Sequence, residues 1–594
     1  MRTRAIKRRH PASLSSGQLL DDLPPLLRRV YLQRGICSTQ ELNRQLGGML
    51  PPGTLKGLPE SLVLLHGAML SQKKIMVIGD FDADGATSTA LAILGLGAMG
   101  VKNIDYLVPD RFQFGYGLSP GIVEVAAQQG AELIVTVDSG ISSIEGVAVA
   151  KKAGIQVLVT DHHLPGESLP VADAILNPNQ NGCEFPSKNL AGVGVVFYLL
   201  VALRAHLRSL AWFEARGLPE PNLADYLDLV ALGTVADVVP LDRNNRTLVF
   251  QGLQRIRAGK CRPGILALLS LANREPSRIV ASDLGFAVGP RLNAAGRLES
   301  MSLGIECLLA SDADVSMSLA EELDTLNRER RVIEVGMKEE AIKALESLQL
   351  GNGTQLPWGL ALFRAGWHQG VIGIVASRIK DLHHRPVVAF APAEDKTYIK
   401  GNTLRGDDEL KGSARSISGF HIRDALEAVS TKHPCLILKF GGHAMAAGLS
   451  ILAKDFDTFA DAFDQQVRKQ LNEADLKAEL LSDGDLQPRD ISLENAELLR
   501  NQGPWGQGFP EPLFDGQFEV LQQRIVGEKH LKLVLSPPAS NNIFDAIAFN
   551  VDLQQWPNKE KYAQLAYRLD VNEYRGQRSV QLVAQFIAPL VSLK

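Results

Sequence analysis

The sequence predicts an α/β protein in which a parallel, doubly wound domain is joined by a long helix to a smaller α/β domain, followed by a C-terminal β-barrel domain. From residue 74 to about 240, short apolar strands alternate with helical patterns, which is typical of a parallel sheet covered by helices. Residues 312–350 repeat apolar side chains at helical spacing without a proline. From residue 515 onward the pattern changes to short β runs.

The strands of the first sheet are expected where apolar runs end in polar residues. They are "KIMVIGD" (74–80), "NIDYLVP" (103–109), "ELIVTVD" (132–138), "QVLVTD" (156–161) and "AILN" (174–177). Residues 240–310 have a largely helical pattern, and a second α/β block follows Gly351 and Gly353. The β runs after residue 515 suit a small barrel of the size of an oligonucleotide-binding fold.

These patterns divide the chain into five expected segments. They are an N-terminal arm with short helices at 1–60, the first α/β domain at 61–311, the connecting helix at 312–350, the second α/β domain at 351–460, and a helical lead-in with the barrel at 461–594. A helix as long as the one at 312–350 usually bridges two bodies, so we expect it to connect the two α/β domains.

Composition indicates an ordinary globular chain. Of the 594 residues, 45% are hydrophobic and 22% are charged, and the formal net charge is −4. This balance gives no sign of nucleic acid, so such a role must rest on local basic patches. No run of 18 apolar residues is present, and the basic start "MRTRAIKRRHP" is not followed by the apolar core of a signal peptide. We therefore expect a soluble, cytoplasmic protein without a membrane partner.

The five cysteines are scattered and contain no C-x-x-C pair. They fit neither a disulfide framework nor a zinc site, and we expect buried thiols in a reducing compartment.

Acidic and histidine side chains follow the apolar runs of the first domain. Asp80, Asp82 and Asp84 follow the first of them, Asp138 follows "ELIVTV", and "QVLVT" is followed by Asp161, His162 and His163. A later apolar segment, "YLDLVALGTVADVVPL", leads to Asp237. In an open parallel sheet, ligands bind outside the carboxyl ends of the strands, so we expect these residues to meet there. Alternate positions of an extended chain point to one side, which would let Asp80, Asp82 and Asp84 converge before Gly85 turns the chain into a helix.

Oxygen-rich ligands with one or two imidazoles favour Mn²⁺ or Mg²⁺ over zinc. The carboxylates exceed what one divalent ion needs, whereas a pair of ions about 3.5–4 Å apart would use them all and would stabilise the attacking and leaving oxygens at phosphorus. The nucleophile would then be an activated water, and no Ser or Cys nucleophile is required.

The acidic residues also have two simpler interpretations. A lone Asp after a strand is usually a helix N-cap or turn residue, and Asp161 taken alone fits that role. The order Asp-x-Asp-x-Asp-Gly resembles a calcium loop, but position 91, where such a loop needs Glu, is Leu, and no helix precedes it. Four such clusters at strand ends are not expected by chance.

The motifs "GDFDADG", "VTVDSG", "TDHH" and "GTVADVVPL" resemble the four motifs of the DHH phosphoesterase superfamily. Five further segments resemble, more narrowly, the RecJ family of single-strand-specific 5′→3′ DNA exonucleases. They are "PDRFQFGYGLS" (109–119), "GPRLNAAGRL" (289–298), "WHQGVIGIVASR" (367–378), "GSARSISGF" (412–420) and "FGGHAMAAG" (440–448). The resemblance spans residues 70 to 590 and makes the first domain a DHH domain and the second a DHHA1 domain.

The resemblance implies a set of metal ligands and catalytic residues. The implied ligands of two Mn²⁺ or Mg²⁺ ions are Asp80, Asp82, Asp84, Asp138, His162 and Asp237. Asp80 stands where many superfamily members carry a His ligand, so it is either a ligand or a residue that orients the others. His163 falls on a residue associated with the scissile phosphate, where it would stabilise negative charge together with the catalytic carboxylates of Asp82, Asp84 and Asp138.

The second block has the composition of a DNA-handling surface, with glycines for close backbone approach, guanidinium groups and hydroxyls for phosphate, and one Trp for stacking. The expected DNA-contacting residues are Arg291, Asn293, Arg297, Trp367, His368, Gly370, Arg378, Arg405, Ser413, Arg415, Ser416, Gly441, Gly442 and His443. A single Trp beside a strand is more often part of the core, and a lone Arg at a helix start is often only a surface residue. Lys529, His530, Lys532 and Arg575 could add a platform on the barrel.

The leading functional hypothesis is a metal-dependent exonuclease that releases mononucleotides from single-stranded DNA in repair and recombination. A DHH phosphodiesterase or pyrophosphatase acting on small nucleotides is one alternative, although it would not need the barrel. The other is a non-catalytic replication scaffold of the Cdc45 kind, which the intact ligand motifs oppose. The resemblance implies single-strand-binding protein and a RecQ-type helicase as partners, and we expect a monomer.

Overall fold

The computed structural model describes residues 5–10, 20–110, 114, 117–352, 356–393, 405–538, 540–553 and 555–592. The chain separates into two compact units. The larger unit comprises Arg8–Asn327 and Leu481–Lys594, and the smaller unit comprises Met1–Lys7 and Arg328–Leu480. Residues 111–113 and 115–116 of the "PDRFQFGYGLS" motif lie outside the described residues.

The larger unit contains the predicted parallel sheet. Its strand order is β3-β2-β4-β5-β6, and all neighbours are parallel, with Ile75 opposite Ile104 on one side and Leu133 on the other. The order confirms the doubly wound fold. The strands are β2 (Ile75–Ile78), β3 (Ile104–Leu107), β4 (Leu133–Val137), β5 (Gln156–Thr160) and β6 (Ala174–Leu176).

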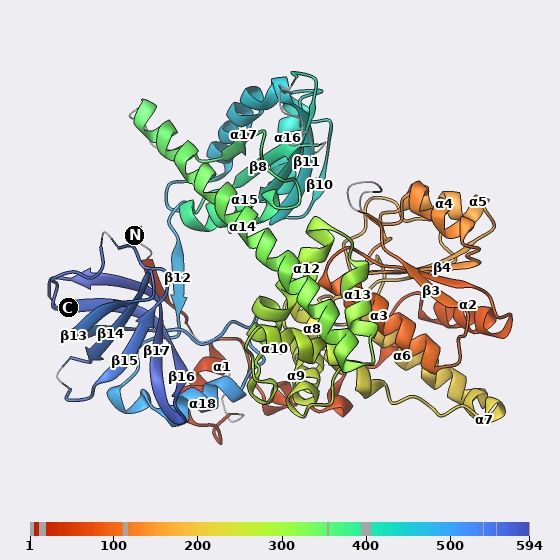
Figure 1. The fold of residues 1–594 in the computed structure, drawn as a ribbon, viewed down its shortest axis with the longest axis horizontal. Coiled ribbons are helices and arrows are strands. Elements are labelled where there is room, and N and C mark those ends of the chain that lie inside the picture. Colours follow the sequence, from red (N-terminus) through yellow and green to blue (C-terminus); the bar gives the residue numbers. More distant parts are fainter. Residues whose placement is uncertain are drawn as a thin grey trace. The chain divides into compact units, whose positions relative to one another are not determined.

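Helices cover both faces of this sheet because both faces are apolar (Figure 1). Met76 and Ile78 of β2 pack with α4 and α5, whereas Ile75 and Val77 face the core that contains α3 and α6. The alternation is the period of two that a strand imposes on its side chains. The helices are α2 (Leu58–Leu70), α3 (Ala83–Ala98), α4 (Pro120–Gln128), α5 (Ile144–Lys152) and α6 (Gly192–Ser209).

A helical layer follows α6, as the pattern of residues 240–310 predicts. One expectation is wrong here: the apolar segment that leads to Asp237 is a buried helix, not a strand. The elements are α7 (Trp212–Arg216), α8 (Leu227–Ala236), α9 (Arg243–Arg257), α10 (Pro263–Leu271), α11 (Ala281–Asp283), a π-helical turn (Leu284–Val288), α12 (Gly289–Leu298) and α13 (Ser302–Leu309).

The long connecting helix is present as α14 (Ala313–Asn352), which begins in the larger unit and ends in the smaller one. Its buried Ala320 and Leu323 pack in the core of the larger unit, while Met337 and Ala341 pack in a core of the smaller unit. The expectation that this helix connects two bodies is therefore confirmed.

The smaller unit is built on a five-stranded mixed sheet of order β10-β11-β9-β8-β7, in which only β7 and β8 are parallel. Val387 and Ala389 of β8 pack on the α15 side, and Val388 and Phe390 on the side that holds α16 and α17. The boundary expected at residue 460 falls inside α17. The elements are β7 (Leu360–Phe363), α15 (Ile372–His383), β8 (Val387–Pro392), β9 (Glu409–Arg415), α16 (Ile422–Lys432), β10 (Lys439–Gly442), β11 (Ala446–Leu452) and α17 (Phe456–Gln470).

The C-terminal strands form a closed barrel of order β13-β14-β15-β17-β16, which confirms the predicted barrel. Within it β15 and β17 are parallel and the other pairs are antiparallel. The strands are β13 (Phe514–Val526), β14 (His530–Ser536), β15 (Phe544–Ala548), β16 (Tyr562–Tyr574) and β17 (Gln577–Leu590), and α18 (Leu493–Asn501) precedes them.

Near the N-terminus, α1 (Pro25–Leu32) packs in the core of the larger unit, and β1 (Ala5–Arg8) pairs with β12 (Glu479–Ser482). Among the described residues one helix, α6, is long and apolar enough to cross a membrane, but 67% of it is buried inside the protein, as in the core helix of a globular fold.

Candidate metal centre

The first acidic motif lies in the turn between β2 and α3. Asp82 is the N-cap of α3, and its Oδ1 accepts hydrogen bonds from the backbone N–H groups of Asp84 and Gly85 at 2.9 and 3.0 Å. The carboxylates therefore converge through a turn and a first helical turn, not through the alternation of an extended strand as the sequence suggested. Gly85 lies inside the helix, where an added Cβ would overlap the carbonyl oxygen of Asp80.

Asp84 points into the protein and meets the N-terminus of α6. Its carboxylate oxygens accept the backbone N–H groups of Gly192 at 2.6 Å and Val193 at 3.0 Å. A helix N-terminus carries partial positive charge, so it holds this carboxylate in one orientation.

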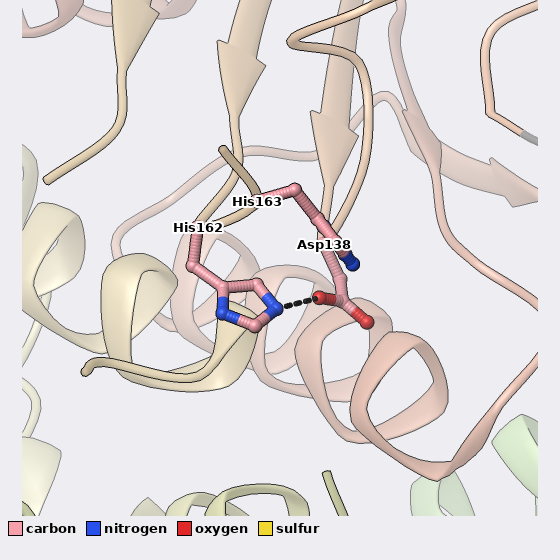
Figure 2. Close-up of side chains that lie close together, drawn as sticks. All are labelled: Asp138, His162 and His163. Atoms are coloured by element: carbon pink, nitrogen blue, oxygen red, sulfur yellow. Dashed lines mark ion pairs between the residues drawn. The ribbon is translucent and has the colours of Figure 1, made fainter. Parts of the chain in front are cut away.

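Asp138, His162 and Asp237 meet at the carboxyl edge of the sheet. Figure 2 shows the ring of His162 directed at the carboxylate of Asp138, with Nε2 3.1 Å from Oδ1. The same nitrogen lies 3.5 Å from Oδ2 of Asp237, which follows the last turn of α8. A helix end thus supplies a side chain that was expected from a strand end.

The predicted ligands form three overlapping groups in which the ligating atoms all lie within 4.8 Å of one another. The groups are Asp80 with Asp82 and Asp138, Asp84 with His162 and Asp237, and Asp138 with His162 and His163. Carboxylate oxygens with imidazole nitrogens are a donor set that suits divalent cations, and overlapping groups suit more than one ion. All six predicted ligands are thus brought together, and the residues present fit divalent metal.

The electrostatics of the centre also call for positive charge. Burial raises the pKa of Asp80, Asp138 and Asp237 well above their ordinary values, and neighbouring carboxylates raise each of them further. Burial, followed by the charge of Asp82, raises the pKa of Asp84 to about 7. A cluster of buried carboxylates is stabilised by binding either protons or cations. Near neutral pH a divalent ion can displace the protons and neutralise the cluster.

Asp161 has a larger role than its sequence context indicated. It is 1% exposed, and its Oδ1 lies 2.8 Å from Nδ1 of His163, while Oδ2 accepts the N–H of Ile141 at 2.9 Å. Burial alone would raise the pKa of Asp161, but the hydrogen bond and charge of His163 lower it. Burial alone would lower the pKa of His163, but Asp161 and further carboxylates raise it to about 9. His163 is therefore a protonated, oriented imidazole at neutral pH.

Two glycines let helices approach the ligands closely, and sequence reasoning missed their role. A Cβ at Gly192 would lie 2.5 Å from Cβ and Oδ1 of Asp138. A Cβ at Gly233 of α8 would lie 2.6 Å from Oδ1 of Asp84. Only a residue without a side chain fits at either position, because real Cβ contacts are longer than this.

Comparison with known proteins defines the family. Residues 74–234 match the DHH family N-terminal domain, residues 358–469 match the DHHA1 domain, and residues 482–585 match the RecJ OB domain. The chain is 56% identical to the single-stranded-DNA-specific exonuclease RecJ of Dickeya dadantii over 98% of this chain and 99% of that protein. The chain belongs to the RecJ family. The Escherichia coli K12 exonuclease RecJ is 56% identical over 97% of this chain and 98% of its own length.

Solved RecJ structures agree in fold. The crystal structure of RecJ from Thermus thermophilus in complex with Mn²⁺ matches with a TM-score of 0.79 at 28% identity, covering 100% of this chain and 81% of that chain. The Mg²⁺ complex of the same protein matches with a TM-score of 0.74 at 27% identity, covering 100% of this chain and 80% of that chain. Together with the ligand cluster, these matches support divalent-metal dependence in this RecJ family member.

Several side chains expected to contact DNA have structural partners instead. Trp367 is 3% exposed, and its indole N–H donates to Oε2 of Glu340 at 2.9 Å, so its ring belongs to the core and is not a stacking surface. Ser416 is 1% exposed, and its hydroxyl donates to the carbonyl of Phe420. Both expectations are corrected, because burial and hydrogen bonding are not visible in residue type.

Other expected residues of the DHHA1 domain lie closer to solvent. Nη1 of Arg415 bonds to Oγ of Ser413 at 3.0 Å, and both side chains are partly exposed. Arg378 is exposed and forms an ion pair with Glu334 at 2.8 Å. His368 and Gly370 share a loop in which Nδ1 of His368 accepts the Gly370 N–H at 3.1 Å. The remaining expected residues Arg405, Gly441, Gly442 and His443 are exposed.

The three residues expected on α12 of this RecJ family member differ in their surroundings. Arg291 is 8% exposed and pairs with Asp324, and Oδ1 of Asn293 accepts the backbone N–H of Ala83 at 2.7 Å. Arg297 is partly exposed. The structure therefore pairs Arg291 in the interior, against the expectation that it contacts DNA, whereas the partly exposed Asn293 uses its carbonyl oxygen to bind Ala83.

Proposed function

We propose that this chain is a divalent-metal-dependent exonuclease that hydrolyses single-stranded DNA from its 5′ end to mononucleotides. The observation that carries the proposal is the convergence of six carboxylate and imidazole ligands at the carboxyl edge of the sheet. It is joined by near-full-length identity of 56% to proteins named single-stranded-DNA-specific exonucleases. The 5′→3′ direction rests on the resemblance to the RecJ family.

Two ions of Mn²⁺ or Mg²⁺ are the proposed cofactors, held by Asp80, Asp82, Asp84, Asp138, His162 and Asp237. Bound there, they would supply Lewis-acid stabilisation of the phosphate and an activated water. Asp80 is included because it shares a ligand group with Asp82 and Asp138. The solved complexes of Thermus thermophilus RecJ with Mn²⁺ and with Mg²⁺ support both ions equally.

We assign to His163 the stabilisation of negative charge on the scissile phosphate. Asp161 takes the Nδ1 side of the ring, so Nε2–H is the donor that would reach a phosphate oxygen. Asp161 and further carboxylates raise the pKa of His163 to about 9, which favours a cationic ring at neutral pH in the metal-free protein. A fixed cationic donor of this kind stabilises charge that develops during the reaction without reorganisation.

In the DHHA1 domain, Ser413 and Arg415 carry the strongest support as phosphate contacts. The acceptors of Arg415 among the described residues are the Ser413 hydroxyl and the Ala414 carbonyl, both neutral, and burial lowers its pKa. The first turn of α15 lies against them, since a Cβ at Gly373 would lie 2.8 Å from Nη2 of Arg415. A guanidinium beside a helix N-terminus attracts an anion, and a DNA phosphate is the one we propose. Arg297, His368, Gly370, Arg378, Arg405, Gly441, Gly442 and His443 complete the proposed DNA contacts.

The two alternatives are less well supported. The closed barrel and the RecJ OB match over residues 482–585 are not needed by a hydrolase of small nucleotides. A non-catalytic scaffold would not need the assembled ligand cluster. The proposal also places the protein in the cytoplasm, as a monomer acting in repair and recombination with single-strand-binding protein and a RecQ-type helicase, all on the resemblance alone.

The test compares substrates and ligand variants in Mn²⁺. We expect hydrolysis of a long single strand to exceed that of a dinucleotide and to be lost in D82N and H162A. D82N keeps the oxygen that caps α3, so the metal-free variant should melt close to the wild type. Nuclease activity retained in the D82N/H162A double variant would refute the proposal.

A further inference from the structure

We propose that Asn293 and Arg291 are positioning residues of the metal centre, and that α12 holds the loop of residues 80–83 in its ligating shape. The inference rests on the metal centre of the proposed function and assigns Asn293 and Arg291 of α12 a role other than DNA contact. Three independent contacts carry it: a helix cap, a close backbone approach and a buried ion pair.

The helix cap accounts for the start of α3. The first four N–H groups of a helix have no partner within it. Here Ala83 donates to Oδ1 of Asn293 at 2.7 Å, and the N–H groups of Asp84 and Gly85 donate to Oδ1 of Asp82. Asn293 therefore completes the cap that Asp82 begins, and it does so from an element 210 residues away in sequence.

The position of Ala83 matters because it lies between two ligands. Asp82 and Asp84 flank it directly, and Ala83 itself is 1% exposed. Without Asn293, its N–H would be left buried without an acceptor, and the turn would shift to reach one. Such a shift would move both flanking carboxylates.

Glycines of α12 and α3 let these two helices pack closely against the backbone of the same loop. A Cβ at Gly296 of α12 would overlap the carbonyl oxygen of Phe81, and a Cβ at Gly85 of α3 would overlap that of Asp80. The backbone of residues 80–81 is therefore enclosed between the two helices. The loop can keep this shape only while α12 keeps its place.

A buried ion pair holds α12 in that place. Nε of Arg291 lies 2.9 Å from Oδ1 of Asp324 on α14, and both residues are 8% exposed. Nη1 of Arg291 also donates to the carbonyl of Ala287 in the π-helical turn at 2.6 Å. The guanidinium is thus neutralised and bonded within the protein, which ties α12 to the connecting helix.

These contacts separate a positioning role from a DNA-contacting role. Phosphate oxygens only accept hydrogen bonds, so a residue that binds phosphate must supply a charge or a donor. The Arg291 charge is paired in the interior, and the Asn293 atom that binds Ala83 is an acceptor, so neither contact is one that phosphate could use. Arg297 on the same helix is partly exposed and provides the matched contrast.

The first experiment measures Mn²⁺ affinity by titration calorimetry without DNA, and single-stranded DNA affinity by fluorescence anisotropy in EDTA. N293L keeps the volume but removes the acceptor, and we expect it to weaken Mn²⁺ binding about 10–100-fold, as loss of a group that orients ligands does. Its DNA affinity should stay within about twofold of wild type. N293D keeps an acceptor oxygen, and we expect Mn²⁺ affinity at or above the wild-type value.

The second experiment removes the ion pair. R291M removes the Arg291 charge that pairs with the buried Asp324, so we expect a lower melting temperature and weaker Mn²⁺ binding. R291M/D324L should recover both because it removes both charges. R297M should lower DNA affinity and leave Mn²⁺ affinity unchanged.

Loss of DNA affinity in N293L with unchanged Mn²⁺ affinity would overturn the inference, as would equal Mn²⁺ affinity in N293L, N293D and wild type. If N293L does not fold, N293A takes its place in the same comparison. Failure of the proposed function would show differently, as a wild-type protein that binds no Mn²⁺ or leaves single-stranded DNA intact.

Discussion

Oδ1 of Asp161 lies 2.8 Å from Nδ1 of His163 and also accepts the backbone N–H groups of His162 and His163, at 2.7 and 3.0 Å. One buried oxygen therefore fixes the ring of His163 and the backbone of the loop that carries His162. The consequence is a cationic imidazole at a fixed place beside the metal ligands. Removing the negative charge of Asp161 tests this arrangement.

The first prediction concerns Asp161. In D161N the negative charge is lost, so the pKa of His163 should fall from about 9 toward its ordinary value of about 6.5. At pH 8 the ring would then be mostly neutral, and single-turnover hydrolysis should slow by about 10²–10³-fold, as for loss of a charge-stabilising donor. The pKa is measured by NMR titration of the His163 ring and the rate by a pH profile.

Mn²⁺ affinity is the control for D161N, and we expect it to change far less than the rate. A His163 pKa that stays near 9 in D161N would contradict the role given to Asp161.

The second prediction concerns the stability of the metal-free protein. The pKa of Asp84 is about 7 in the folded protein and near 3.8 in the unfolded chain, so the folded state holds this proton more tightly. Protonated Asp84 contributes its full stabilisation below the pKa of the unfolded chain, and this contribution is lost as pH rises through about 7. The free energy of unfolding changes by about 1.4 kcal/mol for each unit by which the two pKa values differ. Metal-free wild type should therefore lose stability relative to D84N between pH 5 and 8.

Thermal melts of both proteins in EDTA test this at several pH values. The melting temperature of D84N minus that of wild type should rise with pH and level off above about pH 8. A difference that is constant across this range would contradict the raised pKa of Asp84.

The third prediction concerns Gly192. In G192A the new Cβ would lie 2.5 Å from the Asp138 carboxylate, so the ligand must move, and we expect Mn²⁺ affinity to fall about 10–100-fold. The control is G97A, because nothing lies within 4 Å of a Cβ at Gly97 on α3. That variant should bind Mn²⁺ normally and gain about 0.5–1 kcal/mol in free energy of unfolding. Equal Mn²⁺ affinity in G192A and G97A would count against the close approach of α6.

The fourth prediction concerns Trp367, which the structure places in the core of the smaller unit. W367F loses the hydrogen bond to Glu340, so we expect the free energy of unfolding to fall by about 1–3 kcal/mol in urea. Single-stranded DNA affinity should remain within about twofold of wild type. A large loss of DNA affinity without loss of stability would restore the stacking role that the sequence suggested.

The sheet, the long helix and the barrel could be predicted because each has a distinct apolar period. The run before Asp237 could not be assigned, because a continuous apolar segment does not distinguish a buried strand from a buried helix. For the same reason Asp237 was expected at a strand end, although it follows α8. The predicted ligand side chains still come together, since helix ends and strand ends deliver side chains to the same edge.

Residue type indicated which side chains can bind phosphate, but it could not show which of them the fold uses internally. Trp367, Ser416 and Arg291 have partners that are distant in sequence or formed by a local turn. Asp161 alone resembled an ordinary turn residue, and its role appears only beside His163. No sequence pattern marked Gly192 and Gly233 as part of the site, because each matters through its close approach to a ligand that is distant in sequence.

The most direct test of the central claim uses one long single strand labelled at either its 5′ or its 3′ end and digested with the wild-type protein in Mn²⁺. A metal-dependent 5′→3′ exonuclease releases the 5′ label at once as a mononucleotide, while the 3′-labelled strand shortens gradually. Neither should occur in EDTA or with H162A. Early release of the 3′ label, internal cleavage, or digestion that persists in H162A would contradict it.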